Sequence, residues 1–126
     1  MSTITEAESR IMQVLWNRSP LSAEEVVRAV EPETRWHEKT IKTLLNRLLR
    51  KHAIRAERDG RRYLYSPLLQ REEWQAEESR NLLDRVFGGR LTPLLAHFSQ
   101  QERLGSDELA ELRRLLERIE REEHKP

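Results

Sequence analysis

The sequence of 126 residues contains no cysteine, only 6% aromatic residues and no long apolar run. Without cysteine the chain cannot form disulfides, thiolate metal sites or a cysteine nucleophile, and nothing indicates an oxidising compartment. No apolar run approaches the roughly 20 residues that a helix needs to cross a bilayer, and the first residues lack the apolar core of a signal peptide. We therefore expect a soluble, cytoplasmic protein with no membrane insertion.

Catalytic and metal-binding patterns are also missing from the sequence. There is no glycine-rich phosphate loop, no nucleophile elbow and no paired catalytic constellation. None of the four histidines stands four residues from another, the spacing that places two imidazoles on one helix face to hold a metal. We therefore predict no enzyme activity, no cofactor and no metal site.

The residues from Trp36 to Lys51 predict an amphipathic helix. Apolar residues recur at steps of three and four and form a stripe that faces a core: Ile41, Leu44, Leu45, Leu48 and Leu49. The other side gathers side chains that can donate hydrogen bonds to phosphates or base edges: Lys39, Thr40, Lys42, Thr43, Asn46, Arg47 and Arg50. Such a helix suits the major groove of DNA, where Asn46 or Arg47 could pair bidentately with adenine or guanine. His37, near the start of this helix, is interpreted as a plain surface residue.

A β-hairpin is predicted directly after this helix. Asp59-Gly60 stands between two runs of strand-forming residues, and glycine accepts the positive φ of a type I′ turn. With Asp59 and Gly60 as the loop, the expected cross-strand pairs are Arg58 with Arg61, Glu57 with Arg62, Ala56 with Tyr63, Arg55 with Leu64 and Ile54 with Tyr65. The packed face then carries Ile54, Ala56, Tyr63 and Tyr65. We expect this hairpin to be a wing whose arginines hold backbone phosphates: Arg58, Arg61 and Arg62.

Positive charge is concentrated in the same stretch. Between residues 35 and 62, ten basic residues stand against three acidic ones, a net charge of +7, whereas the whole chain carries only +1. A basic patch on one helix and one hairpin is expected of a surface that binds duplex DNA, because neutralised phosphates release counterions. A solvated face would explain the helix alone, but the arginine-rich hairpin beside it favours DNA binding.

Two further helices are predicted at the N-terminal end. Thr5 with Glu8, and Ser22 with Glu25, have the spacing of capping boxes. The first box opens a helix that ends before Ser19-Pro20, with an apolar stripe of Ala7, Ile11, Val14, Leu15 and Trp16. The second box opens a short helix that Pro32 closes, with an inner face of Val26, Val27, Ala29 and Val30. Three helices followed by a hairpin is the order of a winged helix-turn-helix DNA-binding domain, which we assign to residues 1–69.

Residues 70–126 have a different character, with ten basic residues against thirteen acidic ones. Breaks at Gly88-Gly89 and Gly105-Ser106 predict helices over about 70–87, 91–103 and 107–123. The last helix carries an apolar seam with heptad-like spacing: Leu109, Leu112, Leu115, Leu116 and Ile119. Packing on the chain's own first domain is one way to cover this seam. A C-terminal helical dimerisation domain is favoured, because recognition of a palindrome requires two-fold symmetry.

The order and spacing of several motifs resemble those of a known family. They are Thr5-x-x-Glu8, Ile11-Met12-x-x-Leu15-Trp16, Trp36-x-x-x-Thr40-Ile41-x-Thr43-Leu44-Leu45-x-Arg47-Leu48, Gly60-Arg61 and Tyr63-x-Tyr65-x-Pro67. Together they cover the first domain and are similar to the penicillinase-repressor family (BlaI/MecI/CopY type) of bacterial winged-helix repressors. The second domain is similar in layout, including Phe87-Gly88-Gly89. The overall fold class implied is mainly α with a small β-hairpin.

The resemblance implies a homodimer that sits on a palindromic operator and represses a β-lactamase-type or stress-response operon. In antibiotic-resistance members, release is implied to follow cleavage caused by a membrane-bound metalloprotease-type sensor, at an Asn-Phe bond in the helix before the last. The corresponding position here is His97-Phe98, which departs from that pattern. Copper-responsive members use C-terminal cysteine pairs, which this chain lacks. His52 stands where the family usually has a capping glycine, and histidine can adopt the same left-handed conformation at modest cost.

Two alternatives stay open at this point. The winged helix could bind a protein, with the charged helix merely solvated. A DNA-binding repressor could instead be released by a small apolar ligand.

Overall fold

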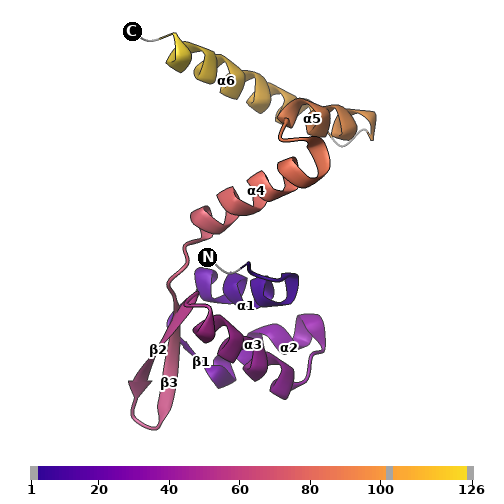
Figure 1. Ribbon diagram of the computed structural model, residues 1–126. Coiled ribbons are helices and arrows are strands. Elements are labelled where there is room, and N and C mark those ends of the chain that lie inside the picture. The colour runs from indigo at the N-terminus through magenta and orange to yellow at the C-terminus, as the bar shows by residue number, and fades with distance from the viewer. Residues whose placement is uncertain (1–2, 102–103, 125–126) are drawn as a thin grey trace. The chain divides into compact units, whose positions relative to one another are not determined.

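The computed structural model describes residues 3–101 and 104–124 of the chain (Figure 1). Within these ranges lie six helices and a three-stranded antiparallel sheet, so the fold is mainly α, as the sequence predicts. The chain divides into two compact units, Met1–Ala76 and Glu77–Pro126. The first unit contains helices α1 to α3, the sheet and the first residues of helix α4.

Both predicted capping boxes are formed, and they fix the starts of α1 (Glu6–Asn17) and α2 (Ala23–Thr34). At α1 the Thr5 hydroxyl accepts from the Glu8 N–H at 3.1 Å, and the Glu8 carboxylate accepts from the Thr5 N–H at 2.8 Å. Ser22 and Glu25 make the same reciprocal pair at 3.2 and 3.0 Å. Each box satisfies two backbone donors that a helix start would otherwise leave unpaired.

Two details predicted for α2 are wrong. Pro32 does not close the helix, which continues to Thr34, because a proline this near the end removes a single N–H donor while the last turn still forms. Arg35 ends the helix in a left-handed conformation, with φ of 59° and its N–H on the Glu31 carbonyl at 2.8 Å. Ala29 is exposed, because the face turned to the core is already filled by Val26, Val27 and Val30.

Helix α3 (Glu38–Arg50) buries the stripe that its sequence predicts, with Ile41, Leu44, Leu45 and Leu48 inside and Leu49 packed beside them. Its C-terminal end is a Schellman motif. The His52 N–H donates to the Leu49 carbonyl at 3.1 Å and the Ala53 N–H to the Leu48 carbonyl at 3.0 Å. His52 has the expected left-handed φ, 59°.

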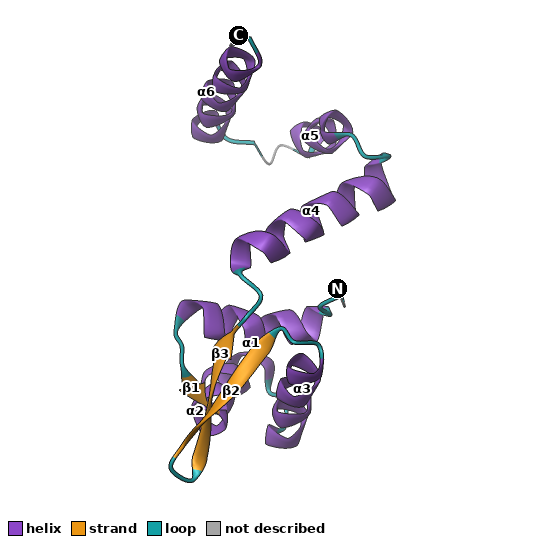
Figure 2. Ribbon diagram, turned by 60° about the vertical axis from the view of Figure 1, so that its left-hand side comes forward, coloured by secondary structure: helices purple, strands orange, loops and turns teal. Residues whose placement is uncertain are grey.

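The wing consists of β2 (Ile54–Asp59) and β3 (Arg62–Pro67), and a short strand, β1 (Leu21–Ser22), pairs with the other edge of β3 (Figure 2). The predicted register of the hairpin is wrong by two residues. Asp59 pairs with Arg62 and Ile54 with Pro67, so Gly60 and Arg61 form the loop. Gly60 has a φ of 65° and Arg61 does not have a positive φ, the pattern of a type II′ turn rather than type I′.

A register shift of two residues leaves every side chain on its predicted face, because strand side chains alternate with a period of two. Ile54 is buried, and Ala56 lies opposite Tyr65 on the same face, as expected. Tyr63 shares this face with Arg58 but lies nearer the tip and is exposed.

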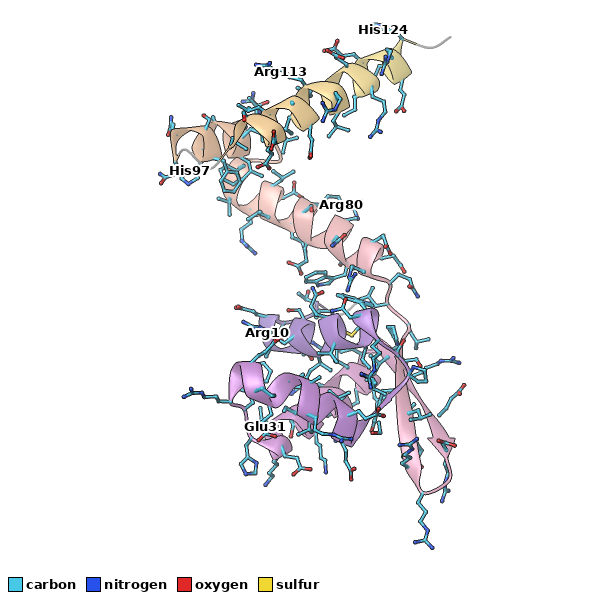
Figure 3. The ribbon with its side chains drawn as sticks, turned by 180° about the vertical axis from the view of Figure 1, so that it is seen from behind. Arg10, Glu31, Arg80, His97, Arg113 and His124 are labelled. Carbon is cyan, nitrogen blue, oxygen red and sulfur yellow. The ribbon has the colours of Figure 1, made fainter. Side chains whose placement is uncertain are left out.

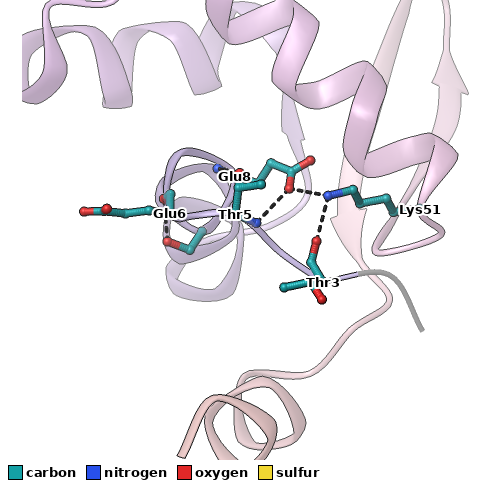
Figure 4. A network of polar contacts seen from close by, with 6 residues as sticks. Thr3, Thr5, Glu6, Glu8 and Lys51 are labelled. Carbon is teal, nitrogen blue, oxygen red and sulfur yellow. Dashed lines mark hydrogen bonds and ion pairs between the residues drawn. The ribbon is translucent and has the colours of Figure 1, made fainter. Parts of the chain in front are cut away.

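A buried ion pair joins the start of α1 to the end of α3 (Figure 4). The Lys51 ammonium donates to the Glu8 carboxylate at 2.5 Å and to the Thr3 carbonyl at 2.7 Å. Burial raises the pKa of Glu8, but the bonds from Lys51 and Thr5 outweigh it, and the pKa lies below its ordinary value. Glu8 therefore stays ionised inside the fold and ties two helices together.

Two tryptophans hold the first turn of α4 (Arg71–Phe87) within the first unit. The Trp16 indole N–H donates to the Leu69 carbonyl at 2.8 Å, and its ring centroid lies 5.3 Å from that of Trp74. Arg71 lies over the Trp16 ring at 5.7 Å and donates to the Asn17 side chain at 2.6 Å. Trp16 and Trp74 are thus packing residues, as predicted.

The rest of α4, α5 (Leu91–Gln100) and α6 (Ser106–Glu123) form the second unit. Gly88 and Gly89, both with positive φ, separate α4 from α5 where a break was predicted. Helix α5 ends at Gln100, short of the predicted 103, and residues 102–103 lie outside the described residues. Side chains such as Arg80, Arg113 and His124 stand out from these helices (Figure 3). None of the helices within the described ranges combines the length and the apolarity required to span a bilayer.

Candidate nucleic-acid interface

The outer side of α3 presents every residue that the sequence analysis assigned to it. All seven side chains are exposed: Lys39, Thr40, Lys42, Thr43, Asn46, Arg47 and Arg50. They are held on one side because the opposite stripe of α3 is fixed in the core. The helix therefore displays a continuous row of hydrogen-bond donors to solvent.

Three contacts within α3 order part of this row. The His37 Nδ1 atom accepts from the Lys39 N–H at 3.2 Å, so His37 is exposed at the surface, as predicted, and also acts as the N-cap of the helix. Lys42 pairs with Glu38 at 3.1 Å, one helical turn away. The Thr43 hydroxyl donates to the Lys39 carbonyl at 2.9 Å.

The other side chains of the row make no hydrogen bond or ion pair within the described ranges. These are Lys39, Thr40, Asn46, Arg47 and Arg50. Their donors are available to a ligand without first breaking a contact inside the protein. Phosphate oxygens and the acceptor atoms of base edges are the partners that suit such donors.

The wing places three arginines around its tip, each in a different setting. Arg58 donates from Nε to the Gly60 carbonyl at 3.2 Å, which leaves its terminal amino groups free. Arg62 pairs with Asp59 at 3.4 Å. Arg61, the second residue of the loop, makes no polar contact among the residues that are described, so it is the most available cation of the wing.

Two other bases of the +7 stretch are already neutralised. Lys51 is paired with buried Glu8, and Arg55 with Glu57 at 3.1 Å. The sequence could not identify Lys51 as a paired base, because its partner lies 43 residues away. Fewer bases are therefore free than the sequence count suggests, and the free ones lie on α3, at the wing tip and at Arg35 between α2 and α3.

A hollow of about 380 Å³ opens on the outer side of α3. Its lining residues are His37, Lys39, Thr40, Thr43, Leu44 and Arg47. A larger hollow of about 850 Å³ lies against α1 and α2, with Arg10, Arg18, Glu25 and Glu33 among its lining residues. It carries both signs of charge and no residue of α3 or the wing, so it does not suit a polyanion as the α3 side does.

The other predicted site residues lie in the second unit. The seam residues Leu109, Leu115, Leu116 and Ile119 are exposed and Leu112 is half-buried. His97 and Phe98 lie in α5, with His97 exposed, Phe98 half-buried and their ring centroids 6.2 Å apart. No cluster of His, Asp or Glu that could hold a metal ion occurs in the described part of the chain.

A helix-turn-helix with an exposed basic third helix and an arginine-tipped hairpin defines the winged-helix class of DNA-binding proteins. Sequence comparison identifies one family within this class. The profile of the penicillinase repressor family matches residues 4–118. The penicillinase repressor of Bacillus licheniformis is 31% identical over 114 residues, covering 90% of this chain and 89% of the relative. The methicillin resistance regulatory protein MecI of Staphylococcus aureus strain N315 is 30% identical over 113 residues, covering 90% and 92%.

Solved structures agree with the sequence comparison. The DNA-binding domain of the repressor BlaI matches with a TM-score of 0.52 and 32% identity, covering 58% of this chain and 93% of that domain. The monomeric form of Bacillus licheniformis BlaI in complex with the blaP half-operator matches with a TM-score of 0.52 and 32% identity, covering 57% and 88%. This chain belongs to the penicillinase-repressor family.

Proposed function

We propose that this protein is a sequence-specific transcriptional repressor that binds a palindromic double-stranded operator as a homodimer. The observation that carries the proposal is the outer side of α3, where unpaired donors stand in a row, together with the free arginine of the wing tip. The similarity to BlaI, whose structure was solved with a half-operator, supports the same role for this domain.

In this proposal α3 lies in the major groove and the wing follows the backbone. Asn46 and Arg47 contact base edges, since both are exposed and unpaired and can bond bidentately. Arg58, Arg61 and Arg62 hold phosphates. Lys42 and Arg50 position the helix through contacts to the DNA backbone.

The second unit is proposed to be the dimerisation domain. No side chain of α4, α5 or α6 is buried in the described ranges, although these helices carry many leucines. On α6 the exposed seam repeats every three or four residues, which suits a partner helix. A second copy of the chain supplies that partner and gives the dimer the two-fold symmetry of a palindrome.

Release from the operator is proposed to follow proteolysis at His97-Phe98, caused by a membrane-bound metalloprotease sensor. Position supports this proposal, because the bond lies in the helix before the last. Proteases bind their substrates in extended form, whereas the His97-Phe98 bond lies in a helix. The end of α5 must therefore unfold locally before this bond is cut. The target is proposed to be a β-lactamase-type or stress-response operon, in line with the names of the relatives.

Fluorescence anisotropy tests the DNA-binding part of the proposal. The duplex is the one that the protein enriches from a random-sequence pool, compared with a scrambled duplex at several salt concentrations. The full-length protein should bind the enriched duplex tightly, and the scramble weakly with a steep dependence on salt. Arg61→Ala should weaken both duplexes alike and flatten the log-log salt slope by about one unit. Arg10→Ala, a matched control on α1, should leave the slope unchanged.

Each part of the proposal has an outcome that contradicts it. Equal affinity for both duplexes means a nonspecific DNA-binding protein. Absence of binding to any duplex at low salt would favour a protein-interaction module instead. A change in sequence preference without a change in slope in Arg61→Ala would contradict the phosphate-binding role of the wing.

A further inference from the structure

The hollow on α3 differs from the rest of the outer side because a leucine of the core is among its lining residues. It is lined by Thr43 and Leu44, with Lys39 and Arg47 beside them. Leu44 belongs to the core and is only 4% exposed, so a small edge of this residue lines the hollow and gives it an apolar floor in our interpretation. Phosphate contacts do not need an apolar floor, and this floor requires a different partner.

Thr43 adds a second apolar group to this hollow. Its hydroxyl is turned back onto the helix and donates to the Lys39 carbonyl at 2.9 Å. Because the hydroxyl is engaged in this bond, the methyl group is the part of the Thr43 side chain that is left free for an outside partner. Thr43 is exposed and lines the hollow, so it presents a methyl group rather than a hydroxyl to a ligand.

Polar groups stand at the rim of the same hollow. The Thr40 hydroxyl makes no hydrogen bond within the described residues, and the Lys39 ammonium is also free. The hollow therefore combines an apolar floor with donors at its edge. In the major groove only thymine offers the matching pair, a C5-methyl group beside the O4 acceptor; cytosine has no methyl group and a donor in place of O4.

We propose that the hollow formed by Thr40, Thr43 and Leu44 selects a thymine in each operator half-site. The Thr43 methyl and the edge of Leu44 pack on the C5-methyl group, and Thr40 or Lys39 donates to O4. The inference rests on the proposed DNA-binding function and adds a base preference to it. It also gives Thr43 a role through its methyl group and not through its hydroxyl.

Uracil scanning of the enriched duplex tests the inference. Each thymine is replaced in turn by uracil, which removes only the methyl group, and affinity of the full-length protein is measured by anisotropy. Burial of one methyl group corresponds to about fourfold in affinity, so one thymine per half-site should show a loss of this size. A 5-methylcytosine·guanine pair there keeps the methyl group but replaces the O4 acceptor with a donor, and should also bind less well than thymine·adenine.

Two variants assign the effect to Thr43. Thr43→Ser keeps the hydroxyl bond to the backbone and removes the methyl group, so its preference for thymine over uracil at that position should be smaller than that of the unchanged protein. Thr43→Val keeps a methyl group and loses the hydroxyl, so it should still prefer thymine. Both changes are small and lie on an exposed helix face, and circular dichroism checks that the helix content is unchanged.

The outcomes separate the inference from the proposed function. If the enriched duplex binds tightly but no uracil weakens it, the thymine contact is overturned and the repressor function stands. If Thr43→Ser keeps the full preference for thymine, the Thr43 methyl group does not contribute to it and the assignment is overturned. If no duplex is bound at all, the proposed function itself fails.

Discussion

Replacing Lys51 by methionine tests the energetic role of the buried ion pair. Glu8 is 0% exposed, its Oε1 atom receives the Lys51 ammonium at 2.5 Å, and its Oε2 atom has no partner within the described ranges. Methionine keeps the length of the side chain and removes the charge. The Glu8 carboxylate is then buried with only the Thr5 N–H as a partner.

The size of the effect follows from burial. Removing one partner of a buried pair costs about 3–5 kcal/mol. The Lys51 side chain is 23% exposed, so water offsets part of the loss, and we expect the lower end, about 3 kcal/mol at pH 7. Lys42→Met is the matched control: Lys42 and Glu38 are 51% and 53% exposed, and their loss should cost about 0.5 kcal/mol or less.

Urea unfolding followed by tryptophan fluorescence measures both variants in the full-length protein. All three tryptophans lie in the first unit, so the signal reports that unit alone. A midpoint shift at constant slope gives the change in the free energy of unfolding.

The pH dependence provides a second readout. Because the pKa of Glu8 is lowered in the folded protein, the pair stabilises the fold above the unfolded pKa and loses this effect as pH falls through the folded pKa. In Lys51→Met the effect of burial is no longer offset, so the pKa of Glu8 should be raised and protonation should relieve the strain. The stability gap between the two proteins should therefore narrow from pH 7 to pH 4. A Lys51→Met protein as stable as Lys42→Met at pH 7, or a gap independent of pH, would refute this reasoning.

Two further predictions concern the dimer seam and the wing. Leu116 is 53% exposed on α6, and Leu116→Glu should shift the protein from dimer to monomer in sedimentation equilibrium. The unfolding transition of the first unit, followed by tryptophan fluorescence, should not change. A variant that remains fully dimeric would exclude this seam as the dimer interface. Gly60 has a φ of 65° with nothing within 4 Å of an added Cβ, so Gly60→Ala should destabilise the first unit by about 1 kcal/mol through backbone conformation alone, and Gly60→Asn by less. Equal stability of alanine and glycine in urea unfolding would contradict the left-handed turn.

Local patterns in the sequence determined most of the helices of the first unit. The two capping boxes were predictable because each joins residues three apart, so the hydrogen bonds do not depend on the rest of the fold. The apolar stripe of α3 was predictable because it recurs with the helical period, and it fixed which side chains face outward. The candidate DNA-binding residues of α3 follow directly from that orientation.

The register of the wing could not be obtained in the same way. The predicted and observed pairings differ by two residues, and both keep Ile54, Ala56, Tyr63 and Tyr65 on one face. Alternation of apolar residues is therefore identical in the two registers. The turn decides between them, with glycine in the first loop position, and β1 fixes β3 from its other side.

The sequence by itself determined the family, the helices and the side of α3 that faces solvent, because these depend on contacts between near neighbours in the chain. Only the tertiary structure decided which charges of the basic stretch are free, because the partner of Lys51 is 43 residues away. It also showed that the Thr43 hydroxyl bonds the Lys39 carbonyl and that Thr43 and Leu44 line the same hollow. The pairing of Lys51 with Glu8 depends on atoms that come together only when the helices pack, and residue types alone do not specify it.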